Sequence, residues 1–410
     1  MAVLIEELHL ATLRRRPPIP FRKLTFDVAF NKVGAFTLEV PATKRSWALV
    51  QLTTAGDLKP FGLTVDWNGV SSHVFRAESW GYKRALDHQS GRIIEVLTFT
   101  GGDMLSLLAN RIAYPDPTKA WASQPSTTRA YTGAAETVVK QVLAANLVQA
   151  GDAARRVPLL DVAADQGRGG QVTYKIAPIR PPASPTTVGD SPTIASTLMD
   201  MVRAVALQSR IAVRITLHGA RLLCDTYFAR DMTAKAVFAT SLGNLGDVDL
   251  TVSDPTATTI LAQTSTPAYT QTNGTASSDP WQRVEQVLDL TGTDTDAAKS
   301  ATEALAKGAG TVKLAVNAID LPRLRYGAAD VGVTGYQVGD IVTIDLAEAV
   351  TYADIVSKVS FTADTTGAAY AESVTPTIGA DEDAADDQTL TAQLAARLRE
   401  VERKLRATAP

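Results

Sequence analysis

Hydrophobic and polar residues alternate over most of the first hundred positions. Apolar side chains occupy every second position in 23–30 (KLTFDVAF), in 34–41 (GAFTLEVP) up to Pro41, and in 61–67 (FGLTVDW). A period of two is typical of a strand with one buried face. Asn68-Gly69 follows the third of these strands and favours a type I′ hairpin. The run 92–100 (RIIEVLTFT) has few polar positions, as expected of a strand covered on both faces. The pattern predicts a sheet folded on itself over 1–113.

A helical period appears after residue 100. Gly101-Gly102 is expected to break the strand, and Asp103 is expected to cap a short helix. The apolar face of that helix would consist of Leu105, Leu108 and Ile112. This passage therefore predicts the end of the first β domain and the start of a helical segment.

The middle of the chain, 114–235, has the outline of an α+β domain. Helices are predicted over 133–147 and 193–208, separated by a proline-rich stretch at 177–193. The second helix leads into a strand at 211–217, a turn at His218-Gly219 and a return strand at 222–228. Helix, strand, turn and strand in succession predict a compact unit of mixed class.

Residues 236–380 return to strand-forming patterns. The segment is rich in threonine up to about residue 290, and a helix is predicted over 295–307. Strand patterns follow at 311–319, 338–346 and 355–361. These features predict a second β-rich domain that carries one helix.

The last thirty residues, 381–410, differ from the rest. Acidic residues crowd positions 381–387, where they suit the positive end of a following helix dipole. Apolar residues then recur at intervals of four, three and four, namely Leu394, Leu398, Val401 and Leu405. This spacing is typical of a coiled-coil seam. Self-association through these four residues is favoured over packing of the helix on its own domain.

Composition narrows the function classes. A chain of 410 residues with a formal net charge of −3 has no general attraction for nucleic acid or an anionic membrane. A single cysteine, Cys224, excludes an internal disulfide, and no apolar run reaches the roughly 18 residues of a membrane span. Arg14–Arg16 are followed by prolines instead of an apolar stretch, which favours a basic extended arm over an export signal.

No motif predicts a catalytic, cofactor-binding or metal site. The four histidines have no second histidine or cysteine at metal-ligand spacing. Gly189-Asp190-Ser191 resembles an esterase nucleophile block but lies in the proline-rich stretch, without the required strand-to-helix turn. The glycines at 167–170 and 308–310 lack the residues of a phosphate-binding loop and favour an ordinary loop and a helix stop. We therefore expect no enzyme activity and no cofactor.

Short stretches along the chain resemble, in order, the tail-tip hub family of long-tailed phages, in the form common in phages and prophages of actinobacteria. They are GAFTLEVP (34–41), GGDMLSLLANRIAYPDP (101–117), GAAETVVKQVLAANL (133–147), ARRVP (154–158), SLGNL (241–245), WQRVE (281–285), YQVGDIVTI (336–344) and VTPTIG (374–379). Their order and spacing are more specific than any one of them.

The resemblance implies an α+β fold, predominantly antiparallel β, with two tail-tube-like β-barrel domains at 1–113 and 236–380. Interposed α+β domains would complete the hub. The C-terminal coiled-coil helix that the apolar spacing predicts within 381–410 would follow, in departure from longer members of the family. The resemblance further implies a homotrimeric ring at the tail tip of the virion, made in the host cytoplasm. Expected partners are the distal tail protein ring, the tail tube or tape-measure protein, and tail fibre or spike proteins. Opening of the ring would let the genome pass.

Two alternatives from other classes stay open. A tail-associated cell-wall hydrolase would need a convergent catalytic group that the sequence does not display. A carbohydrate-binding adhesion module would use the five tryptophans, which in such strand-rich segments are more often core residues: Trp47, Trp67, Trp80, Trp121 and Trp281.

Overall fold

The computed structural model describes most of the chain. The described residues are 3–54, 56–69, 71–87, 92–176, 196–263, 269–289, 301, 304–305, 308, 311–327, 333–346, 351–367 and 369–379. They fall into two compact units. The first comprises residues 1–180, 194–246 and 317–377, and the second comprises 181–193, 247–316 and 378–410. The predicted domain limits at 113, 235 and 380 stay a prediction.

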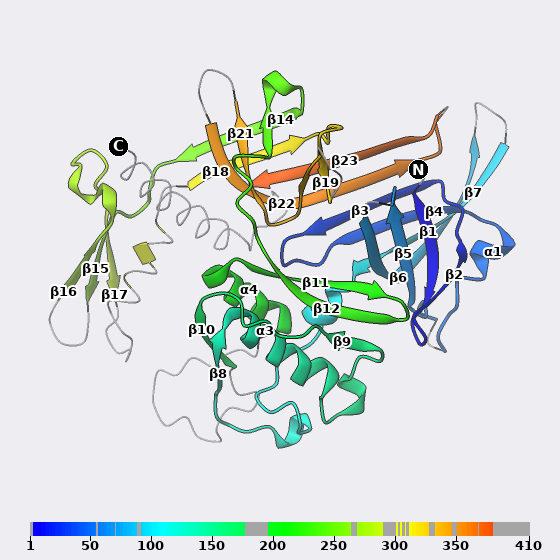
Figure 1. The fold of residues 1–410 in the computed structure, drawn as a ribbon, viewed down its shortest axis with the longest axis horizontal. Helices are drawn as coiled ribbons and strands as arrows, with labels where there is room; N and C mark the ends of the chain where they lie inside the picture. Colours follow the sequence, from blue (N-terminus) through cyan, green and yellow to red (C-terminus); the bar gives the residue numbers. More distant parts are fainter. Residues whose placement is uncertain are drawn as a thin grey trace. The chain divides into compact units, whose positions relative to one another are not determined.

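A large, mostly antiparallel sheet dominates the first unit (Figure 1). Its strand order is β23-β22-β3-β4-β7-β6-β5-β1-β2, with β21 on β22 and β13 on β21. In chain order the bounds are β1 Leu4–His9, β2 Arg14–Pro18, β3 Lys23–Ala29, β4 Ala35–Pro41, β5 Phe61–Trp67, β6 Ser71–Asp87, β7 Arg92–Asp103, β13 Val237–Ala239, β21 Ile341–Asp345, β22 Thr351–Asp364 and β23 Ala371–Gly379. The strands predicted at 23–30, 34–41, 61–67 and 92–100 are confirmed as β3, β4, β5 and β7.

The described strands form an open sheet and not a closed barrel. Closure within residues 1–113 would require β1 or β2 to pair with the free edge of β3. That edge is taken by β22, which pairs with β3 from Lys358↔Ala29 to Asp364↔Lys23. The prediction of two separate barrels is therefore wrong for the described strands, because the segment predicted at 355–361 completes the sheet that the N-terminal strands begin.

Gly101 and Gly102 do not break their strand, contrary to the prediction. β7 continues through both glycines to Asp103. β6 contains a bulge between Ala77 and Ser79, beside Gly101, which brings its backbone unusually close. A Cβ atom on Gly101 would lie 2.0 Å from the carbonyl oxygen of Arg76. The glycine therefore permits close approach of two strands, and the chain leaves the sheet only after Asp103.

The hairpin after β5 forms at the predicted place but with a longer loop. Asn68 and Gly69 both have positive φ angles, 54° and 71°. Trp67 pairs with Ser71, so the loop has one residue more than a two-residue type I′ turn.

A helical layer packs on smaller sheets within the same unit (Figure 1). The helices are α1 Lys44–Trp47, α2 Ser106–Ala109, α3 Ala135–Leu143, which continues as a π-helical turn at Ala144–Val148, and α4 Leu198–Ser209; short 3-10 turns lie at Trp121–Ser123, Ala153–Arg155 and Thr240–Leu242. The strands are β8 Arg129–Ala134, β9 Leu160–Val162, β10 Gln171–Ile176, β11 Ile211–His218, β12 Arg221–Phe228, β19 Leu324–Tyr326 and β20 Thr334–Tyr336. Antiparallel β8 and β10 form one sheet, β11-β12-β9 a second, and β19 pairs with β20.

The two predicted long helices are confirmed, and their apolar stripes form a buried core. Val138, Val139 and Val142 of α3 share a core cluster with Met201 and Val202 of α4, and all are fully buried. α4 begins later than predicted because Thr197 caps it: the Thr197 Oγ1 atom accepts from the amide of Asp200, whose carboxylate accepts from the Thr197 amide.

The second unit contains β14 Leu245–Ser253 next to β18 Thr311–Ala318, and a sheet of order β16-β15-β17. The bounds of this sheet are β15 Thr259–Gln263, β16 Tyr269–Asn273 and β17 Glu285–Asp289, with a 3-10 turn at Thr275–Ser278. The helix predicted at 295–307 lies mostly outside the described residues. No helix in the described part of the chain has both the length and the apolar character needed to cross a membrane.

Candidate functional site

The predicted coiled-coil residues Leu394, Leu398, Val401 and Leu405 lie outside the described residues, so the seam stays a prediction. Gly189-Asp190-Ser191 lies outside them as well. Within the described ranges, no group of three or more histidine, cysteine or carboxylate side chains is arranged to hold a metal ion. Cys224 is buried, and burial raises the pKa of its thiol to about 12, which makes it unreactive.

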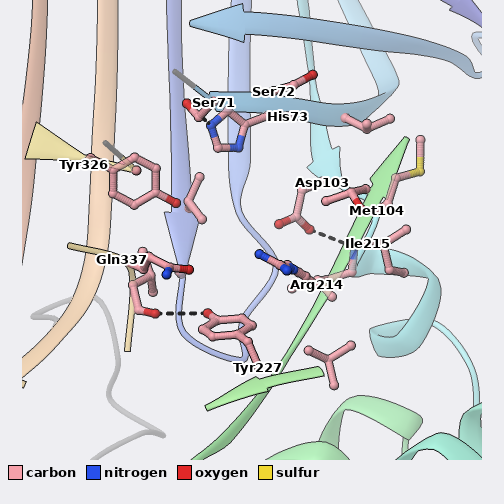
Figure 2. Close-up of a pocket in the computed structure, with 18 of the residues that line it drawn as sticks. Ser71, Ser72, His73, Asp103, Met104, Arg214, Ile215, Tyr227, Tyr326 and Gln337 are labelled. Atoms are coloured by element: carbon pink, nitrogen blue, oxygen red, sulfur yellow. Dashed lines mark hydrogen bonds between the residues drawn. The ribbon is translucent and has the colours of Figure 1, made fainter. Parts of the chain in front are cut away.

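A cavity of about 480 Å³, lined by both polar and apolar side chains, lies in the first unit. Six separate segments line it (Figure 2): the end of β3, the start of β6, the residues from Asp103 to Leu105, the edge strand β11, the residues from Tyr227 to Arg230, and the residues Tyr326, Gly327, Gly335, Gln337 and Val338. Its volume is within the range of small-ligand pockets. Sequence reasoning missed this cavity because its residues share no local motif.

His73 forms one wall of the cavity. His73 is half-buried, and burial lowers the pKa of its imidazole to about 4. Its Nε2 atom lies 2.9 Å from the Ser71 Oγ atom, because residues two apart on a strand share a face. A serine beside a histidine resembles a nucleophile and its base, but an imidazole with this pKa is a weak base. Aromatic rings of Phe26 and Phe361 pack against it, which fixes it as part of the core.

Asp103 lines the opposite part of the cavity, where β7 ends. Its Oδ1 atom accepts from the amide of Leu105 at 2.9 Å. The predicted cap by Asp103 is wrong, because α2 begins at Ser106 with Leu105 as its N-cap and has no side-chain cap hydrogen bond. Burial raises the pKa of the Asp103 carboxyl to about 7, against the lowering effect of hydrogen bonds from backbone amides. The carboxyl is therefore poised to change its charge near neutral pH.

Arg214 and Tyr227 come from β11 and β12. Figure 2 shows the Arg214 guanidinium directed into the cavity, on the side of Asp103. Its Cζ atom lies 5.7 Å from the centre of the Tyr227 ring, a cation–π distance. The Tyr227 hydroxyl donates to the carbonyl of Val338 at 3.0 Å, and burial raises its pKa well above the ordinary value. The arrangement fixes a cation at the cavity wall.

Arg230 is the second cation of the lining, and it is already paired. Its Nε atom lies 3.1 Å from Asp340 Oδ1, and the backbone amide of Arg230 donates to the same oxygen at 3.0 Å. Asp340 also accepts from the amide of Gln337 at 2.8 Å. These hydrogen bonds to the Asp340 carboxylate hold the segment 335–341 against the end of β12.

A second feature is the hairpin arm, which we define as residues 83–87 and 92–95. β5 pairs with β6 only between Ser71 and Ala77, and β4 pairs with β7 only from Val96 onward. The arm beyond is therefore two-stranded, and it carries the cross-strand pair Leu86↔Ile93 with exposed fractions of 53% and 55%. The apolar run at 92–100 predicts a strand that is covered on both sides. This prediction is wrong for residues 92–95, because no third strand pairs with them among the described residues.

Exposed aromatic rings lie at the base of the arm. Trp47 packs edge-on against Trp80 at 6.0 Å between ring centres and against Tyr82 at 5.3 Å, yet Trp47 and Tyr82 stay 41% and 44% exposed.

Trp67 is buried as expected of a core tryptophan, whereas Trp281 in the second unit is 95% exposed. The expectation of a core role is thus wrong for Trp281.

Comparison with known families gives a match over residues 11–380 to the model described as siphovirus ReqiPepy6 Gp37-like protein. The chain belongs to this family. The match covers most of the chain and confirms the resemblance to a tail protein family of long-tailed phages. No curated protein matches the chain.

Solved structures of phage tail proteins have a similar fold. The tail protein from Neisseria meningitidis MC58 matches with a TM-score of 0.50 at 13% identity, over 96% of this chain and 99% of that one. The 43 kDa tail protein of prophage MuSo2 from Shewanella oneidensis has a TM-score of 0.48 at 11% identity, over 92% and 97%. Prophage tail protein gp18 from Listeria monocytogenes EGD-e has a TM-score of 0.44 at 9% identity, over 97% and 100%.

Proposed function

We propose that this chain is a structural hub at the distal tip of a long-tailed phage tail, where three copies form a ring. The observation that carries the proposal is the family match over residues 11–380. The fold shared with the tail protein from Neisseria meningitidis along nearly the full length of both chains adds support. A function in assembly is what the family match supports.

The hairpin arm supports a role in permanent subunit contacts. An isolated two-stranded hairpin is marginally stable in water, and the arm exposes a facing pair of large apolar side chains, Leu86 and Ile93. The exposed rings of Trp47 and Tyr82 extend this apolar surface at its base. Aromatic and aliphatic residues of this kind form the centres of protein interfaces. A neighbouring copy of the chain in the ring is the occupant that we propose.

In this proposal the ring joins the tail tube, the tape-measure protein or the distal tail ring above to fibre or spike proteins below. The C-terminal seam at Leu394, Leu398, Val401 and Leu405 bundles below the ring as a stalk or plug. Opening of that lower end lets the genome pass. In the assembled ring, a neighbouring copy covers the open edge at β2.

Mass measurement in solution tests the ring. We expect a trimer at micromolar concentration, or one formed on adding the distal tail protein, and we expect L86D combined with I93D to give a folded monomer. L52D is the matched control, because Leu52 is also 53% exposed but lies outside the arm. A wild-type chain that stays monomeric with its partners would contradict the proposal, and low-resolution images of the particle locate the ring on the tail.

Two further experiments test the finer parts. Deletion of residues 388–410 is expected to weaken the oligomer, and an unchanged oligomer of unaltered stability would remove the coiled coil from the proposal. Clearing of a peptidoglycan gel by the purified chain would favour a cell-wall hydrolase instead.

A further inference from the structure

The edge strand β11 presents its backbone to the cavity. β12 covers one side of β11, from Ile211↔Phe228 to His218↔Arg221. The amide of Ala229 donates to the carbonyl of Arg210, which places the paired backbone groups of β11 on its even-numbered residues. The backbone groups of Ile211, Val213 and Ile215 therefore point away from β12.

A side-chain amide already occupies the first part of this edge. Asn31 donates from Nδ2 to the carbonyl of Ile211 at 3.0 Å and accepts at Oδ1 from the amide of Val213 at 3.2 Å. One carboxamide thus makes the two hydrogen bonds that the N–H and C=O of one residue in a neighbouring strand would make. Asn31 is buried, and its backbone has a positive φ of 49°, so its position is fixed.

The next step along the edge opens into the cavity. The carbonyl of Val213 and the amide of Ile215 have no hydrogen-bond partner among the described residues, and Val213, Arg214 and Ile215 all line the cavity. Buried or half-buried backbone groups are normally paired. This pair is arranged to receive the N–H and C=O of one residue of a further strand, in line with the carboxamide of Asn31.

A cation lies beside these two backbone groups. Arg214 stands between Val213 and Ile215 in the strand, makes no ion pair within the described part of the chain, and directs its guanidinium into the cavity (Figure 2). The other lining cation, Arg230, is neutralised by Asp340. Asp103 faces the cavity, but burial raises the pKa of its carboxyl to about 7, so at neutral pH it cancels the charge of Arg214 only in part. The site therefore favours an anion directly after a peptide group.

We propose that the cavity binds the C-terminal end of a partner polypeptide in extended form. The N–H of the ligand's last residue donates to the carbonyl of Val213, and the carboxylate of the same residue accepts from the amide of Ile215 and pairs with Arg214. A terminal carboxylate fits better than an acidic side chain, because it belongs to the residue whose N–H donates and Arg214 adjoins the open backbone pair. This is strand addition combined with carboxylate capture. The inference holds whether or not the chain forms a ring.

Three small probes separate the two contacts. The first probe, N-acetyl-L-valylglycine, has the peptide groups and the carboxylate. The second probe is the C-terminal amide of the same dipeptide, which lacks the negative charge. The third probe, N-acetyl-L-valylsarcosine, lacks the N–H that would donate to Val213. We expect calorimetric titration to show the free acid binding at least about tenfold more tightly than the other two probes. R214Q should reduce the affinity for the acid to that for the amide.

R323Q is the matched control, because Arg323 is exposed and lies outside the cavity lining. It should leave all three affinities unchanged. Equal affinities for the three probes, or no binding up to about 10 mM, would overturn the proposal. Acid and sarcosine probes of equal affinity would also overturn it, because they would indicate a carboxylate site without strand pairing. Tighter binding after removal of residues 380–410 would identify the chain's own end as the occupant and overturn the assignment to a partner.

Discussion

Phe26 and Phe361 stack face to face, with ring centres 4.4 Å apart and planes 4° from parallel. They are directly opposite each other in the β3–β22 pairing, although they come from the two ends of the described chain. Both rings are buried, and Trp67 and Phe75 pack against Phe26 edge-on. This pair joins the N-terminal strands to the C-terminal ones.

Replacing Phe361 by alanine is expected to lower the free energy of unfolding by about 3–5 kcal/mol. The substitution removes a buried ring and leaves a cavity among aromatic side chains that cannot collapse into it. F361L should cost less, because leucine retains most of the apolar volume. Urea denaturation followed by fluorescence measures both, and equal losses for the two variants would contradict the packing argument.

Substitution of Gly101 tests the close approach of β6 and β7. G101A places a methyl group against the Arg76 carbonyl and should lower the free energy of unfolding by about 3 kcal/mol or more. G81A is the matched control on the same pair of strands, since a Cβ atom there meets nothing within 4 Å. A G101A variant as stable as G81A would show that the strands separate freely at the bulge.

Glu136 is a fully buried carboxylate held by two cations. Arg168 donates to it from Nε at 2.8 Å and from its backbone amide at 3.0 Å, and Lys140 donates from Nζ at 2.7 Å. The hydrogen bonds from Arg168, followed by those from Lys140, hold the pKa of this carboxyl well below its usual 4.5. E136Q should therefore lower the free energy of unfolding at pH 7 by about 2 kcal/mol, because it removes the charge that accepts from Arg168 and Lys140, while Lys140 keeps its ion pair with Asp225.

The pH dependence of this effect has a definite sign. A depressed pKa stabilises the fold above the ordinary pKa of the group, and this stabilisation is lost as the pH falls through the folded-state value. The difference between wild type and E136Q should thus be full at pH 7 and shrink as the pH falls below about 4.5. A difference that is the same at pH 7 and pH 3 would argue against a charge effect.

Asp103 should show the opposite dependence. Burial raises the pKa of its carboxyl from 3.8 to about 7, so the folded state disfavours the charged form. Its contribution is complete below pH 4 and is lost as the pH rises towards 7. Relative to D103N, the wild type should lose about 1–2 kcal/mol over this range. Comparing the two proteins removes the opposite effect of His73, whose lowered pKa of about 4 destabilises the fold as the pH falls.

Local patterns were sufficient to predict the elements. Alternation over 23–41 and the helical stripes of α3 and α4 depend on neighbouring residues, and these elements lie close to their predicted bounds. The hairpin of β11 and β12 around His218-Gly219 was predicted for the same reason. The family resemblance was also readable, because it rests on ordered stretches of sequence.

Local sequence patterns did not predict which distant segments of the chain contact one another. Alternation shows which face of β22 is buried but not that β3 is its neighbour, and so the sheet was divided into two barrels. The cavity joins Asp103, Arg214 and His73 from distant segments, and Asn31 gives no sign in the sequence that its side chain will bind a strand edge. Gly101 was taken for a strand break because only the bulge in β6 explains its presence.

The pairing of β22 with β3 also sets the order in which the protein can be completed during translation. β3 is among the first strands to leave the ribosome, yet one of its edges has no partner until Asp364 has been made. Contacts between residues so far apart in sequence form slowly and late. A chain that terminates early therefore exposes an unpaired strand edge and cannot finish its main sheet.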